Sequence, residues 1–181
     1  MTSTKKTIVL GITASIAAFR MCDLILDLKK ADIRVLPILS KDAEHFVTPL
    51  TIQSLAAEEV YGDLFQLQHR LKPIHIEVAK AADAVVVAPA TADIIAKMRM
   101  GIADNMLLST LLAVDVPIIV APAMNDKMYS HPATQENLRI LASRGIKILS
   151  PIEGQLVCSD VAMGHIVSNQ QILTAILETL K

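Results

Sequence analysis

Two apolar runs in the sequence lack the alternation of a strand that faces water on one side. The run "ADAVVVAPA" covers residues 82–90, and "VPIIVAPA" covers residues 116–123. Strands of a parallel sheet have this pattern, because helices cover both faces of the sheet. Shorter runs over residues 6–13, 33–40 and 146–151 have the length and composition of further strands. The sequence therefore predicts strands that are buried on both sides.

Segments with helical spacing or helix signals separate these runs. They cover residues 15–32, 48–56, 91–98, 102–114, 131–145 and 168–181, and another helix is expected to begin near His75. Ser15 and Thr48 are suitable N-caps, Pro49 suits a first helical position, and Gly145 closes the helix before it. Alternating strands and helices predict an α/β fold, a three-layer Rossmann-like (flavodoxin-like) parallel sheet with helices on both faces.

Composition narrows the class of protein. The chain has 181 residues, enough for one full-sized core, so we expect one domain over residues 1–181. A net charge of −1 favours neither nucleic acid nor a membrane surface as partner. The two cysteines, Cys22 and Cys158, form no metal-binding spacing, which suits a reduced cytoplasmic setting. Hydrophobic residues make up 52%, which predicts subunit interfaces and hence an oligomer.

The unusual residues gather at one edge of the expected sheet. Residues 11–15, Ser40, residues 88–91 and residues 121–125 all follow the carboxyl ends of expected strands, where α/β sheets bind ligands. The turn "GITASIAA" (11–18) is neither GxGxxG nor a phosphate-binding P-loop. It could present helix N–H groups to a phosphate, or it could be an ordinary tight turn.

Several polar residues are candidates for a site. Thr91, Asp93, Asp104 and Asn105 could bind hydroxyls or ring edges of a flat cofactor, or could only cap helices. His75 could accept a proton or hold a carboxylate. Cys158, in a glycine-flanked loop, could donate a proton or attack a substrate, or could simply pack. The other histidines, namely His45, His69, His131 and His165, have no supporting pattern.

Four segments, in this order, resemble one family. "GITASIAAF", "HIEVAKAADAVVVAPATADIIAKMRMGIADN", "PAMNDKMYSHPATQEN" and "CSD..MG" are similar to the homo-oligomeric flavin-containing cysteine decarboxylases. The resemblance runs from Lys6 to Ile166, and PAMNxxM with the upstream HIxxAKxAD is its specific part. A flavin prenyltransferase begins similarly, but PAMN and His75 argue against it.

This resemblance implies a function. It implies FMN-dependent decarboxylation of 4′-phosphopantothenoylcysteine to 4′-phosphopantetheine in coenzyme A biosynthesis, by flavin oxidation to a thioaldehyde, loss of CO₂ and re-reduction. It implies one flavoprotein domain, a small-molecule substrate, a homotrimer or dodecamer, and no metal. Two alternatives stay open: a peptidyl-cysteine decarboxylase of lantibiotic-type peptide maturation, and a non-catalytic FMN-binding regulatory homologue.

The resemblance also implies roles for individual residues. His75 and Cys158 would be catalytic, with Cys158 on a flap that closes over substrate. The substrate would be bound by Asn125, Met128, Gln155, Leu156 and Val157. FMN would be bound by Gly11, Ala14, Ser15, Ile16, Ser40, Thr91, Ala92, Asp93, Ile94, Asp104, Asn105 and Ala123.

The flap departs from the family pattern. The family's ACGDxGxGRM is here "VCSDVAMGHI", with Val157 for Ala, Ser159 and Ala162 for Gly, and His165 for Arg. Fewer glycines restrict positive φ and should stiffen the flap.

Overall fold

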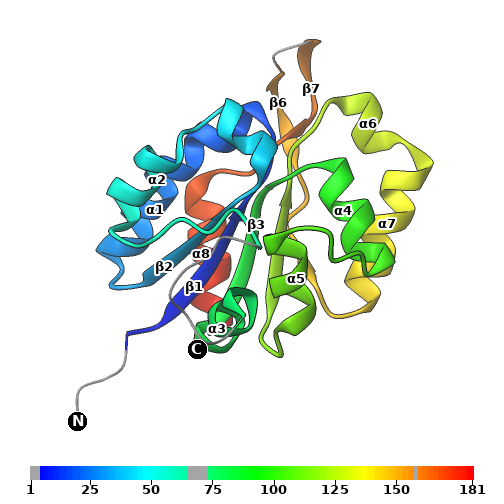
Figure 1. Cartoon of the computed structure of the whole chain (residues 1–181). Coiled ribbons are helices and arrows are strands. Elements are labelled where there is room, and N and C mark those ends of the chain that lie inside the picture. Colours follow the sequence, from blue (N-terminus) through cyan, green and yellow to red (C-terminus); the bar gives the residue numbers. More distant parts are fainter. Residues whose placement is uncertain (1–4, 65–72, 157–158) are drawn as a thin grey trace.

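The computed structural model describes residues 5–64, 73–156 and 159–181, and of residues 155, 156 and 159–161 it describes the backbone. Its main sheet is five-stranded, parallel, and ordered β2-β1-β3-β4-β5 (Figure 1). This is the flavodoxin-like order, so the predicted fold class is confirmed. The strands are β1 Thr7–Ile12, β2 Arg34–Leu39, β3 Ala84–Ala90, β4 Ile118–Pro122 and β5 Lys147–Ile148.

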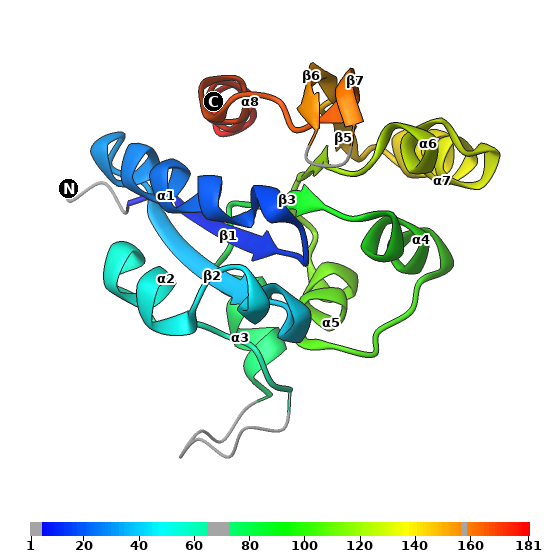
Figure 2. The ribbon, with the colours of Figure 1, turned by 90° about the horizontal axis from the view of Figure 1, so that it is seen from above.

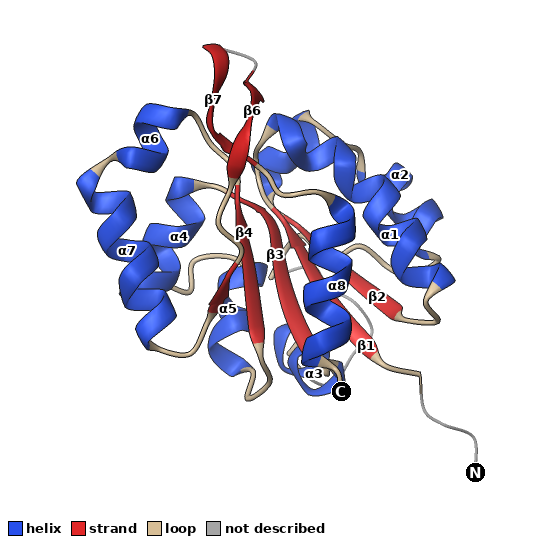
Figure 3. Cartoon of the chain, turned by 180° about the vertical axis from the view of Figure 1, so that it is seen from behind, coloured by secondary structure: helices blue, strands red, loops and turns tan. Residues whose placement is uncertain are grey.

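Helices form the two outer layers (Figure 2). Alternate side chains of the strands belong to two separate hydrophobic clusters, as expected where both faces are covered. The first cluster includes α1 Arg20–Lys30, α2 Pro49–Ala56 and α8 Asn169–Thr179, and α8 crosses the sheet in Figure 3. The second includes α3 Ile74–Ala81, α4 Ala92–Met100, α5 Met106–Ala113 and α7 Pro132–Ser143.

Local sequence signals set most helix boundaries. The Thr48 side chain caps α2 by accepting from Thr51 N, and Pro49 occupies the first position. Ser15 accepts from Ala17 N and caps a short 3₁₀ helix, η1 Ile16–Phe19, which leads into α1. Gly145, at φ +85°, follows the end of α7 as predicted. These predictions are confirmed because each depends on neighbours in the sequence.

The expectation of a helix over residues 102–114 is wrong at its start. Helix α4 ends at Gly101, whose φ of +71° is left-handed, and α5 begins only at Met106. Asn105 has an extended backbone, and its side chain accepts from Leu108 N at 3.0 Å. Residues 102–105 therefore form a loop whose last residue is an N-cap.

Three elements were not predicted. The segment taken as a loop after the fifth strand contains an antiparallel hairpin, β6 Ile152–Leu156 and β7 Ser159–His165, which projects from the upper end of the sheet in Figure 1. A short helix, α6 Asp126–Ser130, follows β4, and a 3₁₀ helix, η2 Lys41–His45, follows β2.

Gly11 allows β1 and α5 to pack closely. A Cβ built on Gly11 would overlap the Leu107 side chain, coming within 2.8 Å of its Cδ2 and closer still to its Cδ1. Leu107 is only 1% exposed, so it has little room to move. A glycine at this position therefore has a packing reason that is independent of any ligand.

We expect Gly11→Ala to destabilise the protein by roughly 1–3 kcal/mol, because the added methyl overpacks a buried contact. Urea unfolding at fixed protein concentration measures the change. Gly62→Ala is the matched control, since its Cβ would meet Leu39 O at an ordinary 3.6 Å. Equal unfolding midpoints for the two variants would contradict the packing argument.

Candidate functional site

A cavity formed by described residues lies beyond the carboxyl ends of β1, β3 and β4. Its volume is about 410 Å³, within the range of roughly 300–1,000 Å³ for small-ligand sites. It is lined by residues between 14 and 20, by Thr91 and Ala92, by residues 123–125 and 128, and by residues 164–166 of β7 and after. The chain leaves β1 and β3 toward helices of different clusters here, so the cavity occupies the topological switch point.

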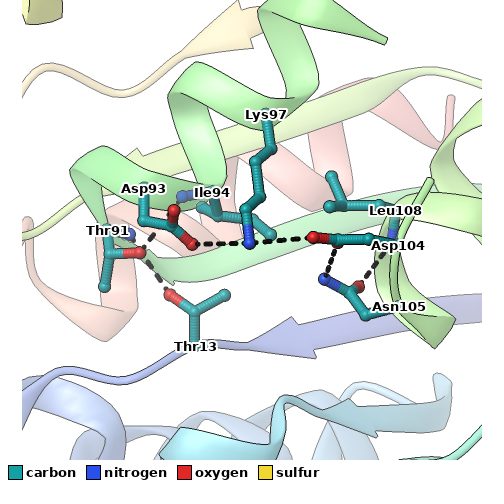
Figure 4. Close-up of polar contacts among 8 residues, drawn as sticks. All are labelled: Thr13, Thr91, Asp93, Ile94, Lys97, Asp104, Asn105 and Leu108. Carbon is teal, nitrogen blue, oxygen red and sulfur yellow. Dashed lines mark hydrogen bonds and ion pairs between the residues drawn. The ribbon is translucent and has the colours of Figure 1, made fainter. Parts of the chain in front are cut away.

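A buried hydroxyl joins the two strand ends at this point. Thr13 is 2% exposed, and its Oγ1 donates to Pro89 O at 2.6 Å. The same oxygen accepts from Thr91 N at 3.2 Å, as Figure 4 shows. Thr91 in turn caps α4 by accepting from Ile94 N. One side chain thus fixes the spacing of the β1 and β3 turns that line the cavity.

Three predicted flavin-site residues lie in a second polar cluster beside α4 (Figure 4). Lys97 pairs with Asp93 at 3.4 Å and with Asp104 at 3.1 Å. Asn105 Nδ2 donates to Asp104, while its Oδ1 caps α5. The hydrogen bond to Asp104 raises the pKa of the Lys97 ammonium above its usual value. Both carboxylates therefore form ion pairs within the protein, although the single ammonium leaves the cluster with one net negative charge.

The PAMN segment forms another wall. Ala123 is buried against the cavity, and Met128 lines it while remaining 50% exposed. Asn125 is the N-cap of α6, and its Oδ1 accepts from Lys127 N at 2.9 Å. Among the residues that the structure describes, its Nδ2 donates to none, so this amide can serve a ligand.

The hairpin is tied to the PAMN segment. Met124 N donates to Gly164 O at 3.1 Å. Gly164 has φ +134°, and a Cβ there would overlap Met124 O. Only glycine permits this close approach, which brings the end of β7 to the cavity.

The structure brings some predicted residues to the cavity and leaves others elsewhere. Ala14, Ser15, Ile16, Thr91, Ala92, Ala123, Asn125 and Met128 line it. Ile94 is 3% exposed in the core, and Ser40 stands at the end of β2, where its N donates to Ile12 O. Gln155 and Leu156 belong to β6, described only by its backbone there, and Val157 and Cys158 lie outside the described residues.

His75 is not part of the cavity. It is half-buried in the first turn of α3. This helix packs against α5 and contributes to the second hydrophobic cluster, whereas α1 contributes to the first. A role for His75 at the cavity of its own chain has no geometric support here.

The sequence-based site prediction missed several cavity residues, among them Phe19, Arg20 and His165. Arg20 Nη2 lies 3.0 Å from His165 Nε2, and its guanidinium lies over the Phe19 ring at 5.9 Å from the centroid. Helical spacing places Arg20 on the charged side of α1, with Asp23 and Asp27 and opposite the core residues. In the sequence, His165 is only a departure from the family's flap pattern. Their approach depends on the hairpin, which the sequence did not reveal.

Within residues 5–64, 73–156 and 159–181, no cluster of three or more His, Cys, Asp or Glu could hold a metal ion. In the same part of the chain, no helix has the length and apolar character that crossing a membrane requires.

The flavoprotein family model matches residues 1–181, so the chain belongs to that family of flavin-binding α/β proteins. Two relatives of similar sequence come from coenzyme A biosynthesis. The chain is 43% identical over 171 residues to the coenzyme A biosynthesis bifunctional protein CoaBC of Haemophilus influenzae. The matched region covers 94% of this chain and 43% of that relative. The chain is 40% identical over 168 residues to CoaBC of Bacillus subtilis, covering 93% of this chain and 41% of the relative. The chain spans less than half the length of these relatives.

A solved structure is also similar to this chain in fold. A PPC decarboxylase mutant in complex with pantothenoylaminoethenethiol matches with a TM-score of 0.88 at 27% identity, covering 96% of this chain and 97% of that one.

We expect Thr13→Val to destabilise the protein by roughly 1–3 kcal/mol, because it leaves Pro89 O and Thr91 N buried without their partner. Chemical unfolding measures the loss. Thr13→Ser retains the hydroxyl and should recover most of the stability that the valine variant loses. If serine and valine prove equally destabilising, the methyl group and not the hydrogen bonds stabilises this point.

Proposed function

We propose that the chain is an FMN-dependent decarboxylase that converts 4′-phosphopantothenoylcysteine to 4′-phosphopantetheine. The observation that carries this proposal is the switch-point cavity, where Asn125 of PAMN and the end of the hairpin meet the turn after β1. The names of the CoaBC relatives and of the PPC decarboxylase structure support the same reaction. The proposal concerns this step alone, because the chain matches under half of each CoaBC relative. We place the reaction in the cytoplasm.

The residues present fit FMN. The cavity walls are mostly apolar, as a flat ring requires, with polar groups at Ser15, Thr91 and Asn125. A solved relative at 28% identity, with a TM-score of 0.84 and covering 96% of each chain, is the FMN-binding protein AtHal3. Ala14, Ser15, Ile16, Thr91, Ala92 and Ala123 would contact the cofactor directly. Gly11, Ser40, Asp93, Ile94, Asp104 and Asn105 would shape its surroundings.

Bound FMN would supply the two-electron oxidation of the cysteine side chain that makes loss of CO₂ possible, and would return the electrons afterwards. The protein's own residues orient the substrate and handle protons. Asn125 would donate its free Nδ2–H groups to the substrate carboxylate, so that binding energy is used for orientation. Met128 would cover the apolar part of the substrate, together with Gln155, Leu156 and Val157. Cys158 would donate the last proton.

The position of His75 bears on assembly. It lies away from the cavity of its own chain, and several cavity residues are exposed in the monomer, Ile16 by 54% and Phe19 by 55%. We propose a homotrimer, or a dodecamer built from trimers, in which His75 of one subunit reaches the cavity of the next. This arrangement would cover the exposed apolar surface and complete the site.

The reaction is tested with purified protein. We expect a yellow protein with oxidised-flavin absorbance that releases CO₂ from 4′-phosphopantothenoylcysteine and forms 4′-phosphopantetheine. A peptide ending in cysteine serves as the alternative substrate and should not react. Turnover of the peptide alone would assign peptide maturation instead. Flavin binding without turnover of either would leave a regulatory flavoprotein.

The shared site is tested by mixing two inactive variants. His75→Asn should retain FMN but lose decarboxylation, and Asn125→Ala should lose it too. When the two variants are co-expressed and mix at random, about a quarter of the subunit boundaries should pair an intact His75 with an intact Asn125. The mixed oligomers should therefore recover about a quarter of wild-type activity. Light scattering checks that the particles are trimers or a multiple of trimers. If mixed oligomers stay inactive, His75 does not act across a subunit boundary.

A further inference from the structure

Arg20 carries the only fixed charge among the residues that line the cavity. It is the first residue of α1 and half-buried, and the other lining residues are small, aliphatic, aromatic or neutral polar groups, together with His165. Within the described part of the chain, Arg20 makes no ion pair. Its guanidinium lies over the Phe19 ring, which limits its movement. A cation held in this way in an apolar wall attracts an anion.

The hydrogen bonds of His165 define how Arg20 is held. His165 Nδ1 lies 2.8 Å from Ile166 O, and a carbonyl oxygen only accepts, so Nδ1 carries the hydrogen. In the neutral ring Nε2 is then the acceptor, and it receives Arg20 Nη2–H at 3.0 Å. His165 thus orients the guanidinium without cancelling its charge, and the remaining N–H groups of Arg20 stay available.

The backbone of Arg20 is fixed as well. Asn169 Nδ2 of α8 donates to Arg20 O at 2.9 Å. The start of α8 therefore fixes the backbone of Arg20, and the end of β7 holds its guanidinium on the α1 side of the cavity. Asn125 lies on the other side, after β4 and at the start of α6. A ligand with two anionic groups could therefore bind Asn125 through its carboxylate and Arg20 through its second anionic group.

We propose that Arg20 anchors a phosphate monoester on the α1 side of this cavity, with His165 as its positioning residue. The inference rests on the proposed function, because that function supplies two ligands ending in such a group, the substrate and FMN. Arg presents paired N–H donors that match phosphate oxygens, and charge-assisted hydrogen bonds of this kind are the strong ones. Arg20 would then distinguish phosphorylated ligands from their unphosphorylated counterparts.

The test compares ligand pairs that differ only in the phosphate. One arm measures the affinity of flavin-free protein for FMN and for riboflavin by fluorescence titration. The other measures the affinity of FMN-loaded protein for 4′-phosphopantetheine and for pantetheine by calorimetry. Arg20→Gln should weaken binding of the phosphorylated member of one pair by roughly 10–100-fold and of its partner by less than about 3-fold. The arm that responds identifies the source of the phosphate.

Three further variants sharpen the test. Arg20→Lys keeps the charge but not the paired donors, and should recover part of the phosphate preference. His165→Phe keeps an aromatic ring but removes both ring nitrogens, and should reduce the same preference by roughly 3–10-fold, because the hydrogen bond that orients Arg20 is lost. Arg139→Gln removes an equal charge from an exposed position on α7 and should change nothing.

The outcome is decisive whether or not the protein decarboxylates. Both arms measure binding, so absence of CO₂ release would refute the proposed reaction without affecting this comparison. If Arg20→Gln changes the affinities for both members of each pair by the same factor, or changes neither affinity, Arg20 is a packing residue and the inference is overturned. Circular dichroism of each variant checks that the fold is intact.

Discussion

The cavity depends on one buried hydroxyl. Thr13 Oγ1 donates to Pro89 O and accepts from Thr91 N, at the point where the chain leaves β1 and β3 toward different hydrophobic clusters. Diverging strand ends expose backbone groups that neither helix can satisfy, and burial of such groups without partners is costly. A threonine hydroxyl supplies one donor and one acceptor at once. The two turns that line the cavity are therefore fixed relative to each other by a contact that involves no ligand.

Much of the fold could be predicted from the sequence, because its signals are local. Continuous apolar runs such as residues 82–90 identify strands buried on both faces, and their alternation with helices predicts a parallel sheet covered on both sides. Ser168 shows how well caps can be inferred: it forms a capping box with Gln171 at the start of α8, within the segment expected to be helical. The cavity position was predictable for the same reason, since it lies at the carboxyl ends of the strands.

The rest depended on contacts between distant segments. The hairpin β6–β7 has no clean alternation, and its place is set by Met124 N donating to Gly164 O. The sequence could not assign Arg20 to the cavity, because helical spacing separates core from non-core positions and cannot distinguish a cavity wall from open solvent. His165 approaches Arg20 across 145 positions of sequence. Residues 102–105 were misread as helix because the left-handed Gly101 and the Asn105 cap are both short signals within an otherwise helical pattern.

The electrostatic field in the cavity depends on which of the nearby charged side chains already form ion pairs within the protein. Asp93 and Asp104 are carboxylates of the predicted cofactor site, yet both form ion pairs with Lys97, which cancels one of their two negative charges. Among the described residues Arg20 contacts His165 and the Phe19 ring but makes no ion pair with a carboxylate, so its positive charge is not cancelled there. Opposite charges that pair locally contribute little field at a distance, while an unpaired one dominates its surroundings in a cavity of low polarity. If Arg20 anchors a phosphate as proposed, the site favours anionic ligands although the whole chain carries a net charge of −1. Net charge would have indicated no such preference, because it counts the paired carboxylates and the free guanidinium alike.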